Sequence, residues 1–148
     1  MAIGVDCGGR KVAIVDVANS FYFSFEIKKI DYERWFREAR DEVESVAFHL
    51  EGRGPWYVEA PIMAGARNIQ STIKVAQTVG LVRTLVPNAI EVAVSSWKKA
   101  TVGNGNASKD MVREWLERVH PEVAHMCLGN QDLYDAACIS LYGGDQGS

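Results

Sequence analysis

The chain has 148 residues, of which 47% are hydrophobic and 24% are charged, and its formal net charge at pH 7 is −3. This composition indicates one globular domain over residues 1–148, and no apolar run approaches the roughly 20 residues of a membrane span. The N-terminus lacks the features of a signal peptide, so we expect a cytoplasmic protein with no membrane partner. The three cysteines form no Cys-x-x-Cys pair, which argues against disulfides and structural zinc.

The first part of the chain shows three strand patterns joined by turns. Ile3–Cys7 is an apolar run that ends before Gly8-Gly9, and Lys11–Val17 is a second apolar run. Phe21–Ile27 alternates aromatic and polar residues, as a half-buried strand does. The short turns between the three predict an antiparallel meander.

Helices then alternate with strands. Apolar residues recur at helical spacing from Asp31, the expected N-cap, to about Leu50, and again over Asn68–Val86. The strands Trp56–Glu59 and Ile90–Val94 follow these helices, so we expect them to be parallel to an earlier strand.

The C-terminal part is expected to be helical after one loop. Its segments are a loop over Ser95–Asn106, a helix capped by Asn106 or Ser108 and ended by His120-Pro121, and a helix over Asn130–Tyr142 closed by Gly143-Gly144. The predicted fold is therefore α/β, with a five-stranded mixed sheet of three antiparallel and two parallel strands, flanked by helices in the order βββαβαβαα.

Four carboxylates stand at the ends of these apolar elements. Asp6 and Glu59 end the first and fourth strands, and Asp132 and Asp135 lie three residues apart at the start of the last helix. If these ends converge at one edge of the sheet, four carboxylates repel one another unless divalent cations lie among them. Two hard cations held by carboxylates are the usual apparatus for attack of water on a phosphodiester, so we expect two Mg²⁺ or Mn²⁺ ions.

Each acid also has a simpler interpretation. Asp6 precedes a glycine turn, Glu59 is followed by the sequence Ala60-Pro61, and acids near a helix start are stabilised by the helix dipole. The coincidence of all four in the right elements favours the metal site.

A basic segment contrasts with the acidic total. From Ile62 to Lys109 there are six basic residues and one acidic residue, a formal charge of +5, so one face can still attract nucleic acid. The phosphate contacts are expected from Arg67, Lys74, Lys98, Lys99 and Lys109. Trp97 either stacks on DNA or lies in the apolar core, and the lysines have solvated loop and helix-start positions as their simpler interpretation.

Four motifs in register resemble RuvC-type Holliday junction resolvases of the ribonuclease H-like superfamily. The opening Ile-Gly-Val-Asp-Cys-Gly-Gly is similar to the family's Asp-x-Gly start, and Val58-Glu59 is similar to its strand-end glutamate. Residues 97–109, Trp-Lys-Lys-Ala-Thr-Val-Gly-Asn-Gly-Asn-Ala-Ser-Lys, resemble its lysine-rich Gly-x-Gly-x-Ala-x-Lys stretch, and Asp132-x-x-Asp135-Ala136 resembles its final acidic helix. Cys7 replaces a common proline, and Ile62-Met63 stand where many bacterial members carry an aromatic wedge.

The resemblance implies a ribonuclease H-like endodeoxyribonuclease that resolves four-way junctions by paired symmetric nicks. Asp6, Glu59, Asp132 and Asp135 would hold the metals, Lys109 would offset charge on the phosphorane, and Ile62 and Met63 would contact the junction. Paired nicks suit a two-fold homodimer. Its expected interface is the Asn68–Val86 helix, through Ile69, Ile73, Ala76, Gly80 and Leu81. The short chain suggests a compact, phage-encoded member, and no organic cofactor is expected.

Three other functions stay open. The chain could be a less selective RuvC-like nuclease for branched or flapped replication intermediates, or an inert junction-binding protein. The opening motif also resembles the first phosphate loop of actin-like ATPases, but those proteins need two such domains and a second phosphate loop.

Overall fold

The computed structural model describes residues 1–28, 31–61 and 69–146. Its five strands form one mixed sheet, as expected, and their order in the sheet is β3-β2-β1-β4-β5. The strands are β1 (Ile3–Gly8), β2 (Lys11–Asp16), β3 (Phe21–Glu26), β4 (Trp56–Glu59) and β5 (Ile90–Val92). β2 pairs antiparallel with both β1 and β3, whereas β4 is parallel to β1 and β5 is parallel to β4.

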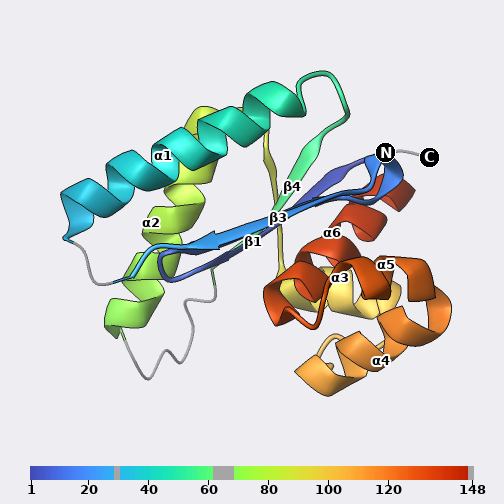
Figure 1. Ribbon diagram of the computed structural model, residues 1–148. Helices are drawn as coiled ribbons and strands as arrows, with labels where there is room; N and C mark the ends of the chain where they lie inside the picture. The colour runs from blue at the N-terminus through green and yellow to red at the C-terminus, as the bar shows by residue number, and fades with distance from the viewer. Residues whose placement is uncertain (29–30, 62–68, 147–148) are drawn as a thin grey trace.

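Helices cover both faces of the sheet (Figure 1). One face carries α1 (Tyr32–His49) and α2 (Ile69–Leu85). The other carries α3 (Val94–Thr101), α4 (Lys109–Val119), α5 (Pro121–Met126) and α6 (Gln131–Gln146), and a short 3-10 helix, Val17–Asn19, joins β2 to β3. In the described part of the chain, no helix is both long and apolar enough to cross a bilayer.

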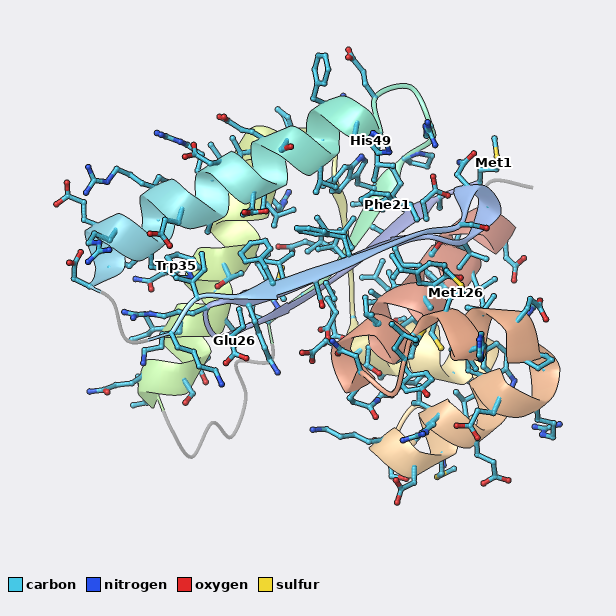
Figure 2. All side chains as sticks on the ribbon, viewed as in Figure 1. Met1, Phe21, Glu26, Trp35, His49 and Met126 are labelled. Carbon is cyan, nitrogen blue, oxygen red and sulfur yellow. The ribbon has the colours of Figure 1, made fainter. Side chains whose placement is uncertain are left out.

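Alternation along the strands divides the core into two layers. Val5, Val12 and Ile14 pack with residues of α1 and α2 on one face, whereas Ala13 and Val15 pack with α6 on the other. Side chains fill both layers (Figure 2), and the three free cysteines are all buried.

Helix α6 packs directly on the backbone of β1. A Cβ atom at Gly4 would collide with the backbone of Ala136 and Ser140, so only glycine permits this approach. The Ser140 hydroxyl donates to the Ala2 carbonyl over 2.7 Å and accepts from the Val17 N–H over 3.2 Å. These contacts fix the position of α6 along the sheet.

Two C-terminal expectations are wrong in their local structure. The loop expected over Ser95–Asn106 begins with helix α3, which also takes Val94 from the expected fifth strand. Gly103 follows this helix with a φ of +92°, so the glycine marks a helix end rather than a long loop. Pro121 starts α5, because the first turn of a helix needs no N–H from that residue.

The last helix also continues beyond its expected end. Helix α6 runs through Gly143 and Gly144 to Gln146. A Cβ atom at Gly143 would collide with the Tyr57 ring and with Ala2. This glycine therefore serves close packing between helix and sheet, and it does not end the helix.

Candidate active site

Strand alternation places Asp6 and Glu59 under α6. Asp6 pairs with Ala13 across the β1–β2 ladder, and directly opposed residues point to the same face, here the α6 face. Glu59 lies two residues beyond Tyr57, which packs in the same layer. Because β1 and β4 are parallel, with Val5 beside Val58, the two acids leave neighbouring strands at one edge of the sheet.

The first turns of α6 bring Asp132 and Asp135 to this edge. The Asn130 side chain begins the helix by accepting a hydrogen bond from the Asp132 N–H over 2.9 Å. Its amide donates to the Ser24 hydroxyl over 3.2 Å, which attaches this turn to β3. Asp135 immediately precedes Ala136, the residue that lies against Gly4, so packing and site geometry come from the same contact.

The other three carboxylates are near enough to Asp6 for their charges to act on its pKa. Burial raises the pKa of Asp6 well above its usual range, and the charges of Glu59, Asp135 and Asp132 raise it further. Burial, followed by the charge of Glu59, raises the pKa of Asp135 to about 6. Burial also raises the pKa of Glu59, although a hydrogen bond from Trp97 and the charge of Lys98 oppose this shift.

Three of the four carboxylates have a partner within the protein. Trp97 Nε1 donates to Glu59 Oε2 over 2.7 Å, and Gln131 Nε2 donates to Asp135 Oδ1 over 3.2 Å. Lys11 Nζ lies 3.0 Å from Asp132 Oδ2. Asp6 is 9% exposed, and the charge of Lys11 lowers its pKa against the burial and the carboxylate charges that raise it.

The donor set fits hard divalent cations, although it is not a closed cage. Among the described residues, no three acidic, histidine or cysteine side chains are close enough to hold one ion as they stand. The charge is nevertheless unbalanced, since within the described residues the charges that oppose the four carboxylates are the ammonium groups of Lys11 and Lys98. A largely buried carboxylate in an all-oxygen acidic cluster matches the ligand preference of Mg²⁺ or Mn²⁺.

The predicted lysines occupy different positions around this cluster. Lys98 Nζ donates to the Ala107 carbonyl over 2.9 Å, and its charge lowers the pKa of both Glu59 and Asp135. Lys109 is the first residue of α4 and is exposed. Among the described residues, Lys11 and Lys98 are the lysines whose charges affect the pKa values of these carboxylates. The structure thus gives Lys109 no contact with the acids, and its catalytic role stays a prediction.

The remaining DNA-contact predictions have mixed outcomes. Lys74 and Lys99 are exposed, and Lys74 lies beside the turn after β1, where a Cβ at Gly9 would be 3.4 Å from the Lys74 Cβ. Trp97 is 0% exposed and packs in the apolar core, as its core alternative expects, and a contact with DNA stays a prediction. Ile62, Met63 and Arg67 lie outside the described residues.

Sequence reasoning missed Lys11, and the hairpin register could have identified it. Gly8 pairs with Lys11 across the turn Gly9-Arg10, so Lys11 points to the same face as Asp6, two residues farther along the ladder. The Trp97 contact with Glu59 had no comparable signal, because it depends on how α3 packs under the sheet.

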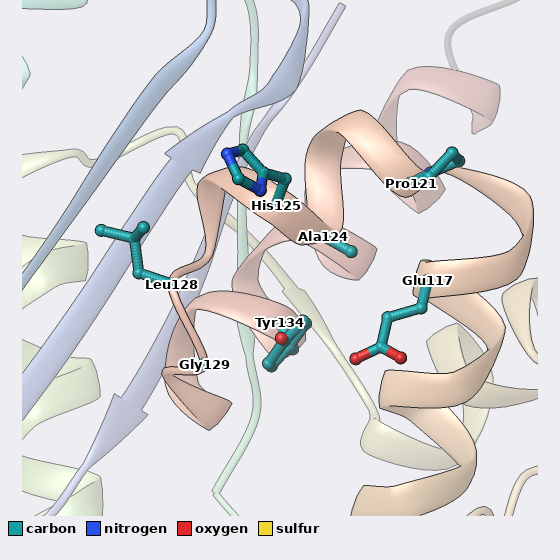
Figure 3. A pocket seen from close by; sticks show the side chains of 7 residues that line it. All are labelled: Glu117, Pro121, Ala124, His125, Leu128, Gly129 and Tyr134. Atoms are coloured by element: carbon teal, nitrogen blue, oxygen red, sulfur yellow. The ribbon is translucent and has the colours of Figure 1, made fainter.

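A separate hollow of about 440 Å³ lies between α4, α5 and the start of α6 (Figure 3). Its lining residues are Glu117, Pro121, Ala124, His125, Leu128, Gly129 and Tyr134. None of the four candidate carboxylates lines it, and Glu117 is already paired with Arg113 Nε over 2.7 Å. It is therefore not the acidic site.

The mixed sheet, with its acidic edge under α6, has the fold of two solved RuvC structures. The chain is similar to the solved structure of Thermus thermophilus RuvC, with a TM-score of 0.70 and 15% identity over 99% of this chain and 96% of that chain. It is also similar to T. thermophilus RuvC in complex with Holliday junction substrate, with a TM-score of 0.72 and 16% identity over 99% and 93% of the two chains. No protein-family model matches the sequence, and no curated protein matches it. The TM-scores show a shared fold, and at this identity they show nothing more. Neither comparison supports a phage origin.

Proposed function

We propose that this chain is a metal-dependent DNA endonuclease that resolves four-way junctions. The observation that carries the proposal is the buried Asp6 carboxylate, which has three further carboxylates around it at one edge of a RuvC-type fold. A neighbour with this fold was solved with a Holliday junction substrate, which favours branched DNA as the ligand. The proposed reaction is hydrolysis of one phosphodiester bond at each of two symmetric positions.

The chain's own groups have distinct tasks in this proposal. Asp6, Glu59, Asp132 and Asp135 hold the cations, and Trp97 orients Glu59 through its indole N–H. When bound, two Mg²⁺ or Mn²⁺ ions would supply Lewis-acid activation of water and stabilisation of the leaving oxygen. Phosphate charge is offset by nearby ammonium groups. Lys109 is the candidate that the sequence predicts, and Lys98 is the lysine whose charge acts on both Glu59 and Asp135.

The proposed homodimer would use the outer surface of α2. Ile69 is 69% exposed and Ile73 is 48% exposed, and Gly80 is also exposed farther along the helix. Leu81 does not belong to this surface, because it is buried against Trp35 and Ala39. Sedimentation tests the proposal, and a monomer at micromolar concentration would argue against a symmetric pair of nicks.

The decisive experiment uses a synthetic mobile four-way junction. Purified protein is incubated with the junction, with and without Mg²⁺ or Mn²⁺, and the nicks are mapped on every strand. We expect metal-dependent paired nicks from the natural chain, and no nicks but intact junction binding from Asp6→Asn. Asp41→Asn, which changes an exposed carboxylate on α1, is the matched control and should cleave normally. Full cleavage by highly purified Asp6→Asn would refute the site.

The same reaction separates the two alternatives. A less selective nuclease would cut forks and flaps as fast as four-way junctions under one condition. An inert junction-binding protein would bind the junction without metal-dependent nicks. Ile62 and Met63 are aliphatic, whereas many bacterial members of the family carry an aromatic wedge at this place. This difference is the reason to test a broader range of branched substrates.

A further inference from the structure

Lys11 places a positive charge directly at the acidic cluster. It is the first residue of β2, and the hairpin register directs its side chain toward α6. Its Nζ atom lies 3.0 Å from Asp132 Oδ2, with the two side chains 39% and 28% exposed. An ion pair this exposed contributes little to stability, so its position at the site is the more informative property.

The direction of this side chain is built into the hairpin. A Cβ atom at Gly8 would collide with Lys11 Cε and Cγ, so the aliphatic part of the lysine lies across the Gly8 backbone. The φ angle of Gly8 is not in the left-handed region, so its backbone does not itself require glycine. What the missing side chain provides is room for Lys11 to reach Asp132.

Lys11 also experiences the rest of the acidic edge. Burial lowers the pKa of its ammonium group, but the hydrogen bond and charge of Asp132, with the charges of Asp6 and Glu26, outweigh burial and raise it. The group is therefore positively charged throughout the physiological pH range. It holds one of the carboxylates that the proposed function assigns to cation binding.

We infer that Lys11 is an internal counter-ion of Asp132, which competes with a divalent cation for that carboxylate. The inference rests on the proposed metal-dependent function, and it goes further by giving a role to a residue outside the acidic motifs. An ammonium group and a metal ion cannot occupy the same side of one carboxylate oxygen. Lys11 therefore weakens cation binding to the DNA-free protein, and removing it strengthens that binding.

A different role would give the opposite result. If Lys11 instead held Asp132 in the orientation that a cation needs, its removal would weaken cation binding, as loss of an orienting partner commonly does by about 10–100-fold. If the pair were only a surface contact, its removal would change nothing.

The test measures Mn²⁺ binding to the purified full chain without DNA. Binding is monitored by calorimetry and by the electron paramagnetic resonance signal of free Mn²⁺. We expect Lys11→Met to bind Mn²⁺ up to about fivefold more tightly than the natural chain, the range that an exposed ion pair allows. Gly8→Ala should also tighten binding, because its methyl group displaces Lys11 while leaving the charge of the chain unchanged. Lys28→Met is the matched control, since Lys28 is a 70% exposed lysine paired with Glu26, and it should bind as the natural chain does.

Asp6→Asn separates failure of this inference from failure of the proposed function. If Asp6→Asn leaves Mn²⁺ binding unchanged, the acidic cluster is not the metal site and both proposals fall. If Asp6→Asn weakens binding while Lys11→Met weakens it or leaves it unchanged, the metal site stands and the counter-ion role of Lys11 is overturned. Circular dichroism of each variant checks that the fold is retained.

Discussion

The acidic cluster should destabilise the metal-free protein, and Asp135→Asn should relieve that cost. The pKa of Asp135 is about 6 in the folded protein against an ordinary value of 3.8. At 1.36 kcal/mol for each unit, folding with an ionised Asp135 costs up to about 3 kcal/mol, and about 1–3 kcal/mol after partial exposure is allowed for. An asparagine keeps the shape and can still accept from Gln131, so the variant should be more stable by this amount at pH 8.

The pH dependence has a definite sign. A raised carboxyl pKa means that the folded state binds the proton more tightly, so the stability contributed by the neutral form is complete below pH 3.8 and is lost as pH rises through 6. The advantage of Asp135→Asn should therefore shrink to about half at pH 5. Urea unfolding in EDTA, followed by the fluorescence of the four tryptophans, measures the free energy of unfolding at both pH values.

Metal and a matched variant complete this test. Asp41→Asn removes an exposed carboxylate from α1 and should leave the free energy of unfolding nearly unchanged. Saturating Mn²⁺ should stabilise the natural chain more than Asp135→Asn, because only the natural chain keeps all four ligands. A variant that is less stable than the natural chain in EDTA at pH 8 would refute the reasoning about repulsion.

Three further predictions concern packing, orientation and DNA contact. Gly4→Ala should lower the free energy of unfolding by about 1–3 kcal/mol in urea titrations, because its methyl group meets the backbone of α6; an unchanged value would contradict that packing. Trp97→Phe keeps a buried ring but loses the hydrogen-bond donor to Glu59. The Mn²⁺ concentration for half-maximal cleavage should therefore rise by about tenfold or more. Junction binding in gel-shift titrations should stay unchanged. Lys74→Ala should weaken junction binding and reduce the slope of log K against log salt by about 1, and an identical slope would remove Lys74 from the phosphate contacts.

Local chemistry explains the parts of the fold that were predictable. Asp31 caps α1 by accepting from the Arg34 N–H over 2.9 Å, and Ser108 caps α4 by accepting from the Met111 N–H over 3.2 Å. Strand patterns also depend on neighbours in sequence, and for that reason the prediction of a five-stranded mixed sheet is confirmed. Glu59 ends β4 as predicted, whereas Asp6 lies two residues before the end of β1, because the ladder with β2 continues to Gly8. The shared face of the two acids follows from the same short-range alternation.

Long-range packing explains the errors. Helix α6 continues through Gly143 because that residue meets Tyr57 on a distant strand, and no nearby residue reveals this contact. Leu81 resembled an interface residue because its helical stripe does not show which side meets α1. Trp97 was ambiguous for the same reason, since only the packing of α3 shows that its indole faces Glu59.

Helix α6 has a double task whose consequence concerns the order of synthesis. The strands and α1 to α5 emerge from the ribosome before it. Until α6 is made, the sheet lacks the helix that packs on β1, and the acids Asp6 and Glu59 lack their counterparts. Completion of the core and assembly of the acidic cluster are therefore the same event. A nascent chain cannot form the proposed metal site before it is folded.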